Sequence, residues 1–91
     1  MTTIETESRY RSGVESQRDV VIVRGQGARL WDDAGREYID CVGGHGTANV
    51  GHCHPTVVEA IRRQAGTLII CPTVFGNDVR ARLLERLVSL A

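Results

Sequence analysis

A glycine-rich stretch divides this chain into two parts with different patterns. It runs from Cys41 to Pro55, reads CVGGHGTANVGHCHP, and holds all three histidines of the chain. Before it, short runs rich in β-branched residues are separated by turn residues, as in consecutive strands. After it, apolar residues recur at the spacing of amphipathic helices. The sequence therefore predicts an α+β chain whose strands precede its helices.

Residues 19–41 are predicted to form a three-stranded antiparallel meander. The first run is β-branched throughout and is bounded by Arg24 and Gly25, which we expect to end the strand. Between the second and third runs, Asp32–Gly35 suits a type I turn closed by a glycine at positive φ. The predicted strands are Val20–Val23, Ala28–Trp31 and Glu37–Cys41.

A first helix is predicted to follow the glycine-rich stretch. Pro55 suits a first helical turn, because the N–H that proline lacks would be unpaired there anyway. Thr56 and Glu59 also have the spacing of a capping box, which leaves the first residue of the helix open. Gly66 is a natural stop, and an apolar connection over residues 67–76 follows it.

A second helix is predicted to begin near Asn77 or Asp78, since either is a good N-cap. Its apolar stripe is still running at Ala91, so we expect the chain to be cut inside a helix. Three parts are predicted. They are an N-terminal arm or frayed helix (1–18), a small-domain meander and helix (19–66), and a connection with a truncated helix (67–91).

Composition excludes several classes of function. The formal net charge is zero and no basic stripe is present, so a nucleic-acid partner is not expected. The apolar runs are far shorter than the roughly 20 residues that span a bilayer. A polar, acidic N-terminus argues against signal and transit peptides. The odd number of cysteines lacks a disulfide framework, so we expect reduced thiols and a cytoplasmic location.

The histidines and cysteines raise the possibility of a metal site. His52, Cys53 and His54 are consecutive, and Cys41, His45 and Cys71 could join them in space. Zinc sites usually show paired ligands at other spacings, and nothing here has them. The competing interpretation is that the histidines cap a helix start and bond to nearby backbone. A small metal-binding module therefore stays open as an alternative, with no metal ligand assigned.

Phosphate binding and nucleophilic catalysis find less support. Gly25–Leu30 begins like a dinucleotide fingerprint, but its sixth residue is leucine and a strand follows it instead of a helix. Cys53 lies beside two histidines that could lower the pKa of a thiol. Adjacency in sequence does not supply the geometry, so an incidental cysteine is the better interpretation. No catalytic residue is assigned.

The order of the motifs resembles the N-terminal region of class III pyridoxal-phosphate aminotransferases. The shared motifs are Gly25–Asp32, Asp32–Gly35, Tyr38-Ile39-Asp40 and Gly51–Pro55. Within the class, the stretch after Asp40 is most similar to the acetylornithine group, and especially to its branch acting on carrier-protein-bound aminoadipate semialdehyde. The resemblance implies the N-terminal part of the small domain of a fold-type-I (aspartate-aminotransferase-like) α/β enzyme.

The same resemblance implies a function and two site residues. The parent enzyme would be a homodimer that uses pyridoxal 5'-phosphate to move an amino group between glutamate and a terminal semialdehyde, in arginine or lysine synthesis. His45 occupies the position of an aromatic residue that lines the substrate pocket in relatives. Phe75 matches a residue that reaches across the dimer, although ordinary core packing is the alternative for it. No cofactor-binding residue is assigned.

The basic residues bear on activity, because all eleven are arginine and none is lysine. Aminotransferases of this class need a lysine to form the Schiff base with the cofactor. We therefore expect the 91-residue chain to be inactive by itself. The alternative, from another class of function, is a non-catalytic truncated protein that pairs with a separate remainder or with a relative.

Overall fold

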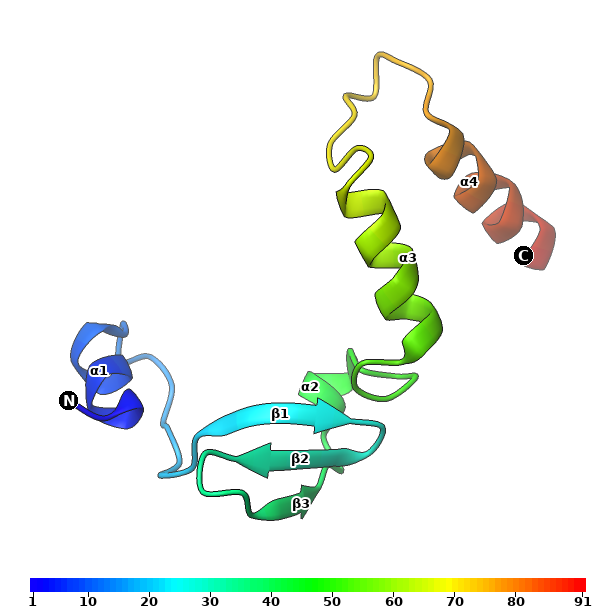
Figure 1. The fold of residues 1–91 in the computed structure, drawn as a ribbon. Coiled ribbons are helices and arrows are strands. Elements are labelled where there is room, and N and C mark those ends of the chain that lie inside the picture. The colour runs from blue at the N-terminus through cyan, green and yellow to red at the C-terminus, as the bar shows by residue number, and fades with distance from the viewer. The chain divides into compact units, whose positions relative to one another are not determined.

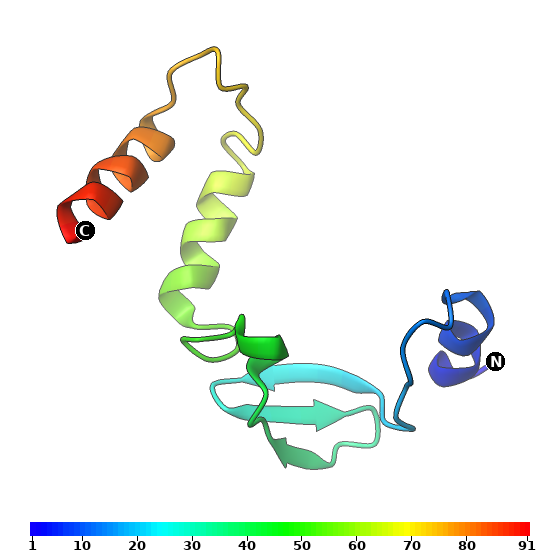
Figure 2. The same ribbon diagram turned by 180° about the vertical axis from the view of Figure 1, so that it is seen from behind.

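The computed structural model describes residues 1–91, which fall into two compact units, Met1–Val58 and Glu59–Ala91. The first unit holds two short helices, a three-stranded sheet and the start of a longer helix, and the second unit holds the rest of that helix and the last helix (Figures 1 and 2). The elements in chain order are α1 (Thr3–Tyr10), β1 (Ile22–Gln26), β2 (Arg29–Asp32), β3 (Glu37–Ile39), α2 (Gly43–Gly46), α3 (Pro55–Ala65) and α4 (Asp78–Leu90).

The predicted meander is confirmed. The strands lie in the order β1-β2-β3 and both pairs are antiparallel (Figure 1). Leu30 at the centre of the sheet faces Gly25 on one side and Tyr38 on the other. The turn between β2 and β3 is also as expected, since the Gly35 N–H donates to the Asp32 carbonyl at 3.0 Å and Gly35 has φ 83°.

The limits of β1 differ from the prediction. The strand begins at Ile22 and continues through Arg24 and Gly25, the two residues expected to end it. Gly25 stays in the strand because it pairs with Leu30, and because its missing side chain leaves room for His52. A Cβ at Gly25 would lie 3.0 Å from two atoms of the His52 side chain. The glycine therefore serves a close approach to the sheet instead of a strand end.

The N-terminal residues form a defined helix. Thr2 and Glu5 make a capping box: the Thr2 hydroxyl accepts from the Glu5 N–H, and the Glu5 carboxylate accepts from the Thr2 N–H. This reciprocal pair satisfies two N–H groups that a helix start leaves without partners. Of the two forms expected for residues 1–18, the helical one is present over Thr3–Tyr10.

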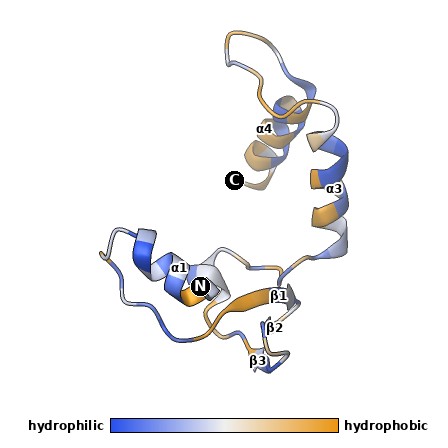
Figure 3. Cartoon of the chain, turned by 60° about the vertical axis from the view of Figure 1, so that its left-hand side comes forward, coloured by the Kyte–Doolittle hydropathy of each residue, from blue (hydrophilic) through white to orange (hydrophobic).

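Both predicted helices begin where local chemistry places them. α3 starts at Pro55, and α4 starts after Asn77, whose side chain accepts from the Arg80 N–H at 2.9 Å. Polar and apolar residues occupy different sides of each helix, as the blue and orange in Figure 3 indicate. The helices are too short and too polar to cross a lipid bilayer.

Residues 1–91 contain no fully buried hydrophobic side chain. On α4, Leu83, Leu84 and Leu87 are each more than half exposed, and Val88 is 75% exposed. Monomeric proteins rarely leave contiguous apolar surface of this kind uncovered. Hydrogen bonds, caps and turns define the local structure here, whereas a packed core does not.

Candidate functional site

The loop between β3 and α3 contains a left-handed turn. Gly43, Gly44 and His45 have φ of 60°, 60° and 59°, and all three lie in or next to α2. Glycine adopts this conformation freely, but an L-residue such as histidine costs about 1–2 kcal/mol there. The turn is closed by backbone bonds from Thr47 and Ala48 to the Gly43 carbonyl, at 2.9 and 2.8 Å. It leaves the side chain of His45 exposed.

Asp40, just after β3, holds the start of this loop. One carboxylate oxygen, Oδ1, accepts the N–H groups of Val42 and Gly43 at 2.9 and 3.0 Å. The other, Oδ2, lies 2.5 Å from Nε2 of His52, and the Asp40 side chain is only 8% exposed. These donors favour the charged form, so the bond from Gly43, then those from His52 and Val42, lower the pKa of Asp40 to about 2.

His52 anchors the other end of the loop to the sheet. Its N–H donates to the Gly27 carbonyl at 2.9 Å, and its carbonyl accepts from the Gly27 N–H at 3.0 Å. Gly51 lies so close to this hairpin turn that a Cβ there would be 3.0 Å from the Gly27 Cα. Both ends of the loop are thus tied to the same end of the sheet, where the β1–β2 turn lies beside the end of β3. Sequence reasoning assigned no role to Asp40, and it considered His52 as a metal ligand or a helix cap but not as the partner of a carboxylate.

His54 bonds to backbone at the start of α3, as the interpretation without a metal predicts. Nδ1 of His54 accepts from the Thr56 N–H at 3.3 Å, and its carbonyl accepts from the Val58 N–H at 2.9 Å. Cys53 beside it is exposed, with φ 53°. Residues 1–91 contain no group of three or more His, Cys, Asp or Glu side chains placed to hold a metal ion. The metal-module alternative therefore lacks a ligand set in this structure.

In the second unit, Arg80 organises the connection that carries Phe75. Its guanidinium donates to the Cys71 carbonyl at 3.3 Å and also to the Phe75 carbonyl. The Phe75 N–H in turn donates to the Pro72 carbonyl at 3.2 Å. Phe75 is 64% exposed, so it is not packed in a core within this chain. His45 and Phe75 belong to different units.

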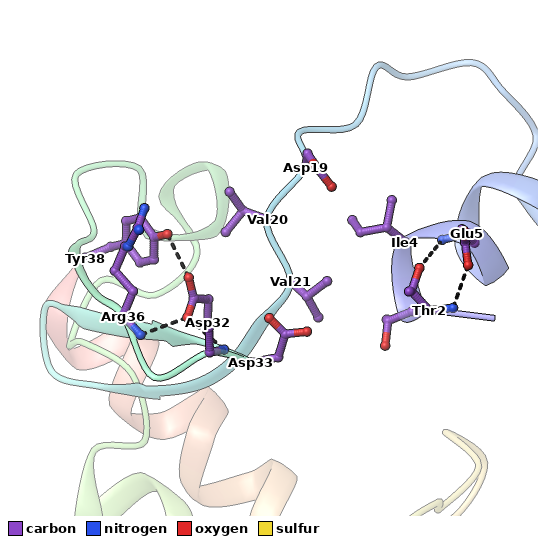
Figure 4. Close-up of a pocket in the computed structure, with 12 residues that line it drawn as sticks. Thr2, Ile4, Glu5, Asp19, Val20, Val21, Asp32, Asp33, Arg36 and Tyr38 are labelled. Atoms are coloured by element: carbon purple, nitrogen blue, oxygen red, sulfur yellow. Dashed lines mark hydrogen bonds between the residues drawn. The ribbon is translucent and has the colours of Figure 1, made fainter.

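One cavity, on the first unit, involves neither predicted site residue. It measures about 520 Å³ and is drawn in Figure 4. Asp32 on its wall accepts from the Tyr38 hydroxyl at 2.8 Å and from the Arg36 N–H at 2.8 Å. The Tyr38 bond is the main cause that lowers the pKa of Asp32, and the same bond raises the pKa of Tyr38. These bonds hold the Asp32 carboxylate within the turn between β2 and β3.

Comparison with known proteins identifies the family. The family model for class-III aminotransferases matches residues 11–91. The chain belongs to this family. It is 52% identical over 87 residues to LysW-aminoadipate semialdehyde transaminase from Deinococcus radiodurans, a match that covers 96% of this chain and 20% of the relative. The chain thus spans about a fifth of the length of the curated relatives it matches.

Solved aminotransferases share the fold. The acetylornithine aminotransferase of Elizabethkingia anophelis matches with a TM-score of 0.91 at 32% identity, over 96% of this chain and 23% of that one. The ornithine aminotransferase of Toxoplasma gondii, described with partial occupancy of PLP at its active site, matches with a TM-score of 0.91 at 36% identity, over 96% and 20%. The chain therefore has the fold of a segment of fold-type-I aminotransferases, as expected.

The residues present do not fit the cofactor of this family. Pyridoxal phosphate is held by a lysine amine, and the 91 residues contain none. The turn at His45 and the loop at Phe75 supply no such amine. What this segment offers at the two predicted positions is an exposed imidazole at His45 in the first unit and an exposed aromatic ring at Phe75 in the second.

Proposed function

We propose that the complete polypeptide to which this segment belongs is a pyridoxal-phosphate-dependent aminotransferase. It moves an amino group between glutamate or 2-oxoglutarate and a terminal semialdehyde, of the N-acetylornithine or carrier-protein-bound lysine type. Support comes from the class-III match over residues 11–91 and from the names of the similar proteins. The lysine that the reaction needs lies outside residues 1–91 in this proposal, and the enzyme is a cytoplasmic homodimer.

The observation that carries the site assignment is the left-handed backbone at His45. Such a conformation in a residue other than glycine persists only where the surroundings enforce it, and it is concentrated at functional sites. Here the turn is closed by several backbone bonds and the imidazole is exposed. In the proposal His45 donates a hydrogen bond to a substrate carboxylate, and Phe75 contributes an apolar wall.

The test is a steady-state assay of the complete polypeptide with glutamate and each semialdehyde. A hydrogen bond to a charged group is worth about 1.5–3 kcal/mol, so His45→Ala should lower kcat/KM by about 10- to 150-fold. His45→Asn is the matched control, because asparagine tolerates positive φ and keeps an N–H donor. It should retain most of the activity. Unchanged kinetics in His45→Ala would refute the assignment of His45.

The 91-residue chain alone is proposed to be inactive, since it contains no lysine. The intact mass of the protein in its source cells, captured with an antibody to residues 1–18, tests whether these residues belong to a longer polypeptide. A species several times larger than 10.0 kDa supports the aminotransferase proposal. A species of 10.0 kDa supports the second candidate described next. In the same proposal, residues 1–18 are an N-terminal arm, residues 19–66 belong to the small domain, and residues 67–91 are a connection with a truncated helix.

The second candidate is a non-catalytic chain that pairs with a separately encoded remainder or a relative. The observation that favours it is the exposed apolar stripe of α4, in which Leu83, Leu84 and Leu87 are each more than half exposed. Sedimentation of the chain as purified from its source cells distinguishes a monomer from a complex with a second polypeptide. A folded monomer would argue against pairing, whereas a stable complex with a second polypeptide would support it.

A further inference from the structure

We propose that Asp40 and His52 are a positioning pair that fixes the loop 41–51 and thereby sets the affinity of the site for substrate. Neither residue touches substrate in this proposal. They act through His45, which the loop carries, so the statement about affinity rests on the proposed function. The statement about the loop rests on geometry alone.

The first step is the use of both carboxylate oxygens of Asp40. Oδ1 accepts hydrogen bonds from the N–H groups of Val42 and Gly43, which begin the loop, and Oδ2 accepts one from Nε2 of His52. Three donors on one carboxylate, with a side chain 8% exposed, leave little access for water. Hydrogen bonds to a charged acceptor are roughly twice as strong as neutral ones. Asp40 therefore ties the start of the loop to its end.

The second step is the anchorage of His52. Its backbone makes two hydrogen bonds with Gly27, in the turn between β1 and β2. Its ring packs where a Cβ at Gly25 would lie, which holds it against the face of the sheet. Because His52 is fixed to β1 and Asp40 follows β3, their contact closes a loop between residues 12 apart in sequence. The loop ends are thus set by the sheet and not by the loop itself.

The third step concerns the strained turn inside the closed loop. His45 is held at φ 59°, where a histidine is disfavoured. If either side chain of the pair is removed, the loop ends keep their backbone bonds to the sheet but lose the tie between them, and the turn relaxes more often to the ordinary backbone region. The imidazole would then leave its position for part of the time. Substrate affinity should fall with the population of the competent loop, while the chemical step is little affected.

Hydrogen exchange of the complete polypeptide, followed by mass spectrometry, tests the loop directly. In Asp40→Ala and His52→Ala, the peptide over residues 41–51 should exchange about tenfold faster, the size expected for a lost charge-assisted bond. Glu37→Ala is the matched control. It removes a carboxylate of the same meander that pairs with Arg29 at 3.1 Å on the surface, and residues 41–51 should not respond. His52→Gln, which keeps a side-chain donor, should restore part of the protection.

Two results would overturn the positioning role. One is unchanged exchange over residues 41–51 in His52→Ala. The other is equal acceleration across the whole polypeptide, which would mean a general loss of stability. Kinetics then test the affinity statement: His52→Ala should raise KM about tenfold with kcat changed less than about twofold. A lowered kcat with unchanged KM would overturn it. If the wild type transaminates no semialdehyde, the proposed function fails, and the exchange experiment still decides the role of the pair.

Discussion

Gly51 offers a sharp test of how the loop is attached to the sheet, and Gly46 is its matched control. The two glycines lie in the same loop with nearly the same positive φ, 84° and 82°. A Cβ at Gly51 would lie 3.0 Å from the Gly27 Cα and 3.2 Å from its carbonyl carbon and oxygen. A Cβ at Gly46 would meet nothing within 4 Å. Alanine at the two positions therefore differs in one respect only, the close approach to Gly27.

The difference in unfolding free energy between the two variants follows from the one contact that they do not share. Each loses about 1–2 kcal/mol for alanine at positive φ and regains about 0.4–1 kcal/mol from a less flexible unfolded chain. These contributions cancel in the comparison. Gly51→Ala must also displace Gly27 and weaken its two backbone bonds with His52, each worth about 0.5–1.5 kcal/mol. The free energy of unfolding should therefore fall by about 1–3 kcal/mol more in Gly51→Ala than in Gly46→Ala.

The assay is urea unfolding of the complete polypeptide, followed by circular dichroism, with both variants measured beside the wild type. The difference between their midpoints, multiplied by a shared denaturant slope, gives the difference in free energy. Hydrogen exchange over residues 22–32 shows whether the loss lies in the hairpin. Equal destabilisation of the two variants would refute the argument, since it would mean that the contact between Gly51 and Gly27 contributes nothing.

Three further predictions concern single side chains. The pKa of Asp40 is lowered from 3.8 to about 2, so its charge stabilises the folded chain above pH 3.8, and this stabilisation is lost as the pH falls from 3.8 to about 2. Over that pH range the urea midpoint of the wild type should therefore fall more steeply than that of Asp40→Asn. Parallel curves for the two proteins would contradict this. Asn77→Ala should lower the free energy of unfolding by about 1 kcal/mol through the lost cap of α4, measured by thermal unfolding, whereas Asn77→Ser should be nearly neutral. Arg80→Met keeps the apolar stem but removes the bonds to the Cys71 and Phe75 carbonyls; proteolysis between residues 71 and 76 should accelerate, and resistance equal to the wild type would refute the bracing role of Arg80.

Much of the local structure was predictable because it depends on neighbouring residues. Asn77 caps a helix through a bond to a residue three positions later, and Pro55 suits a first turn by its own ring. The turn at Asp32–Gly35 follows from a glycine at positive φ. The order of the strands followed from short connections, which join consecutive strands as antiparallel neighbours.

The candidate site was less predictable. Reasoning from the sequence selected His45 and Phe75 through a family resemblance, and their roles stay predictions. It did not select Arg80, because no local pattern indicates that an arginine inside a helix reaches back to two loop carbonyls. The same holds for Gly25: the sequence predicts a strand end there, whereas Gly25 is a strand residue that makes room for His52.

The sequence by itself determined the strand-then-helix order, the caps and the hairpin turn, since each depends on interactions within a few residues. It also determined that these 91 residues carry no lysine. Only the tertiary structure decided that Asp40 meets His52, that Gly51 touches the Gly27 turn, and that His45 adopts a left-handed backbone. The physical reason is that the first two are contacts between residues 12 or more apart, and that His45 lies in the loop whose ends these contacts hold. Such pairs form only after the sheet has brought distant backbone together, and no spacing in the sequence records that approach.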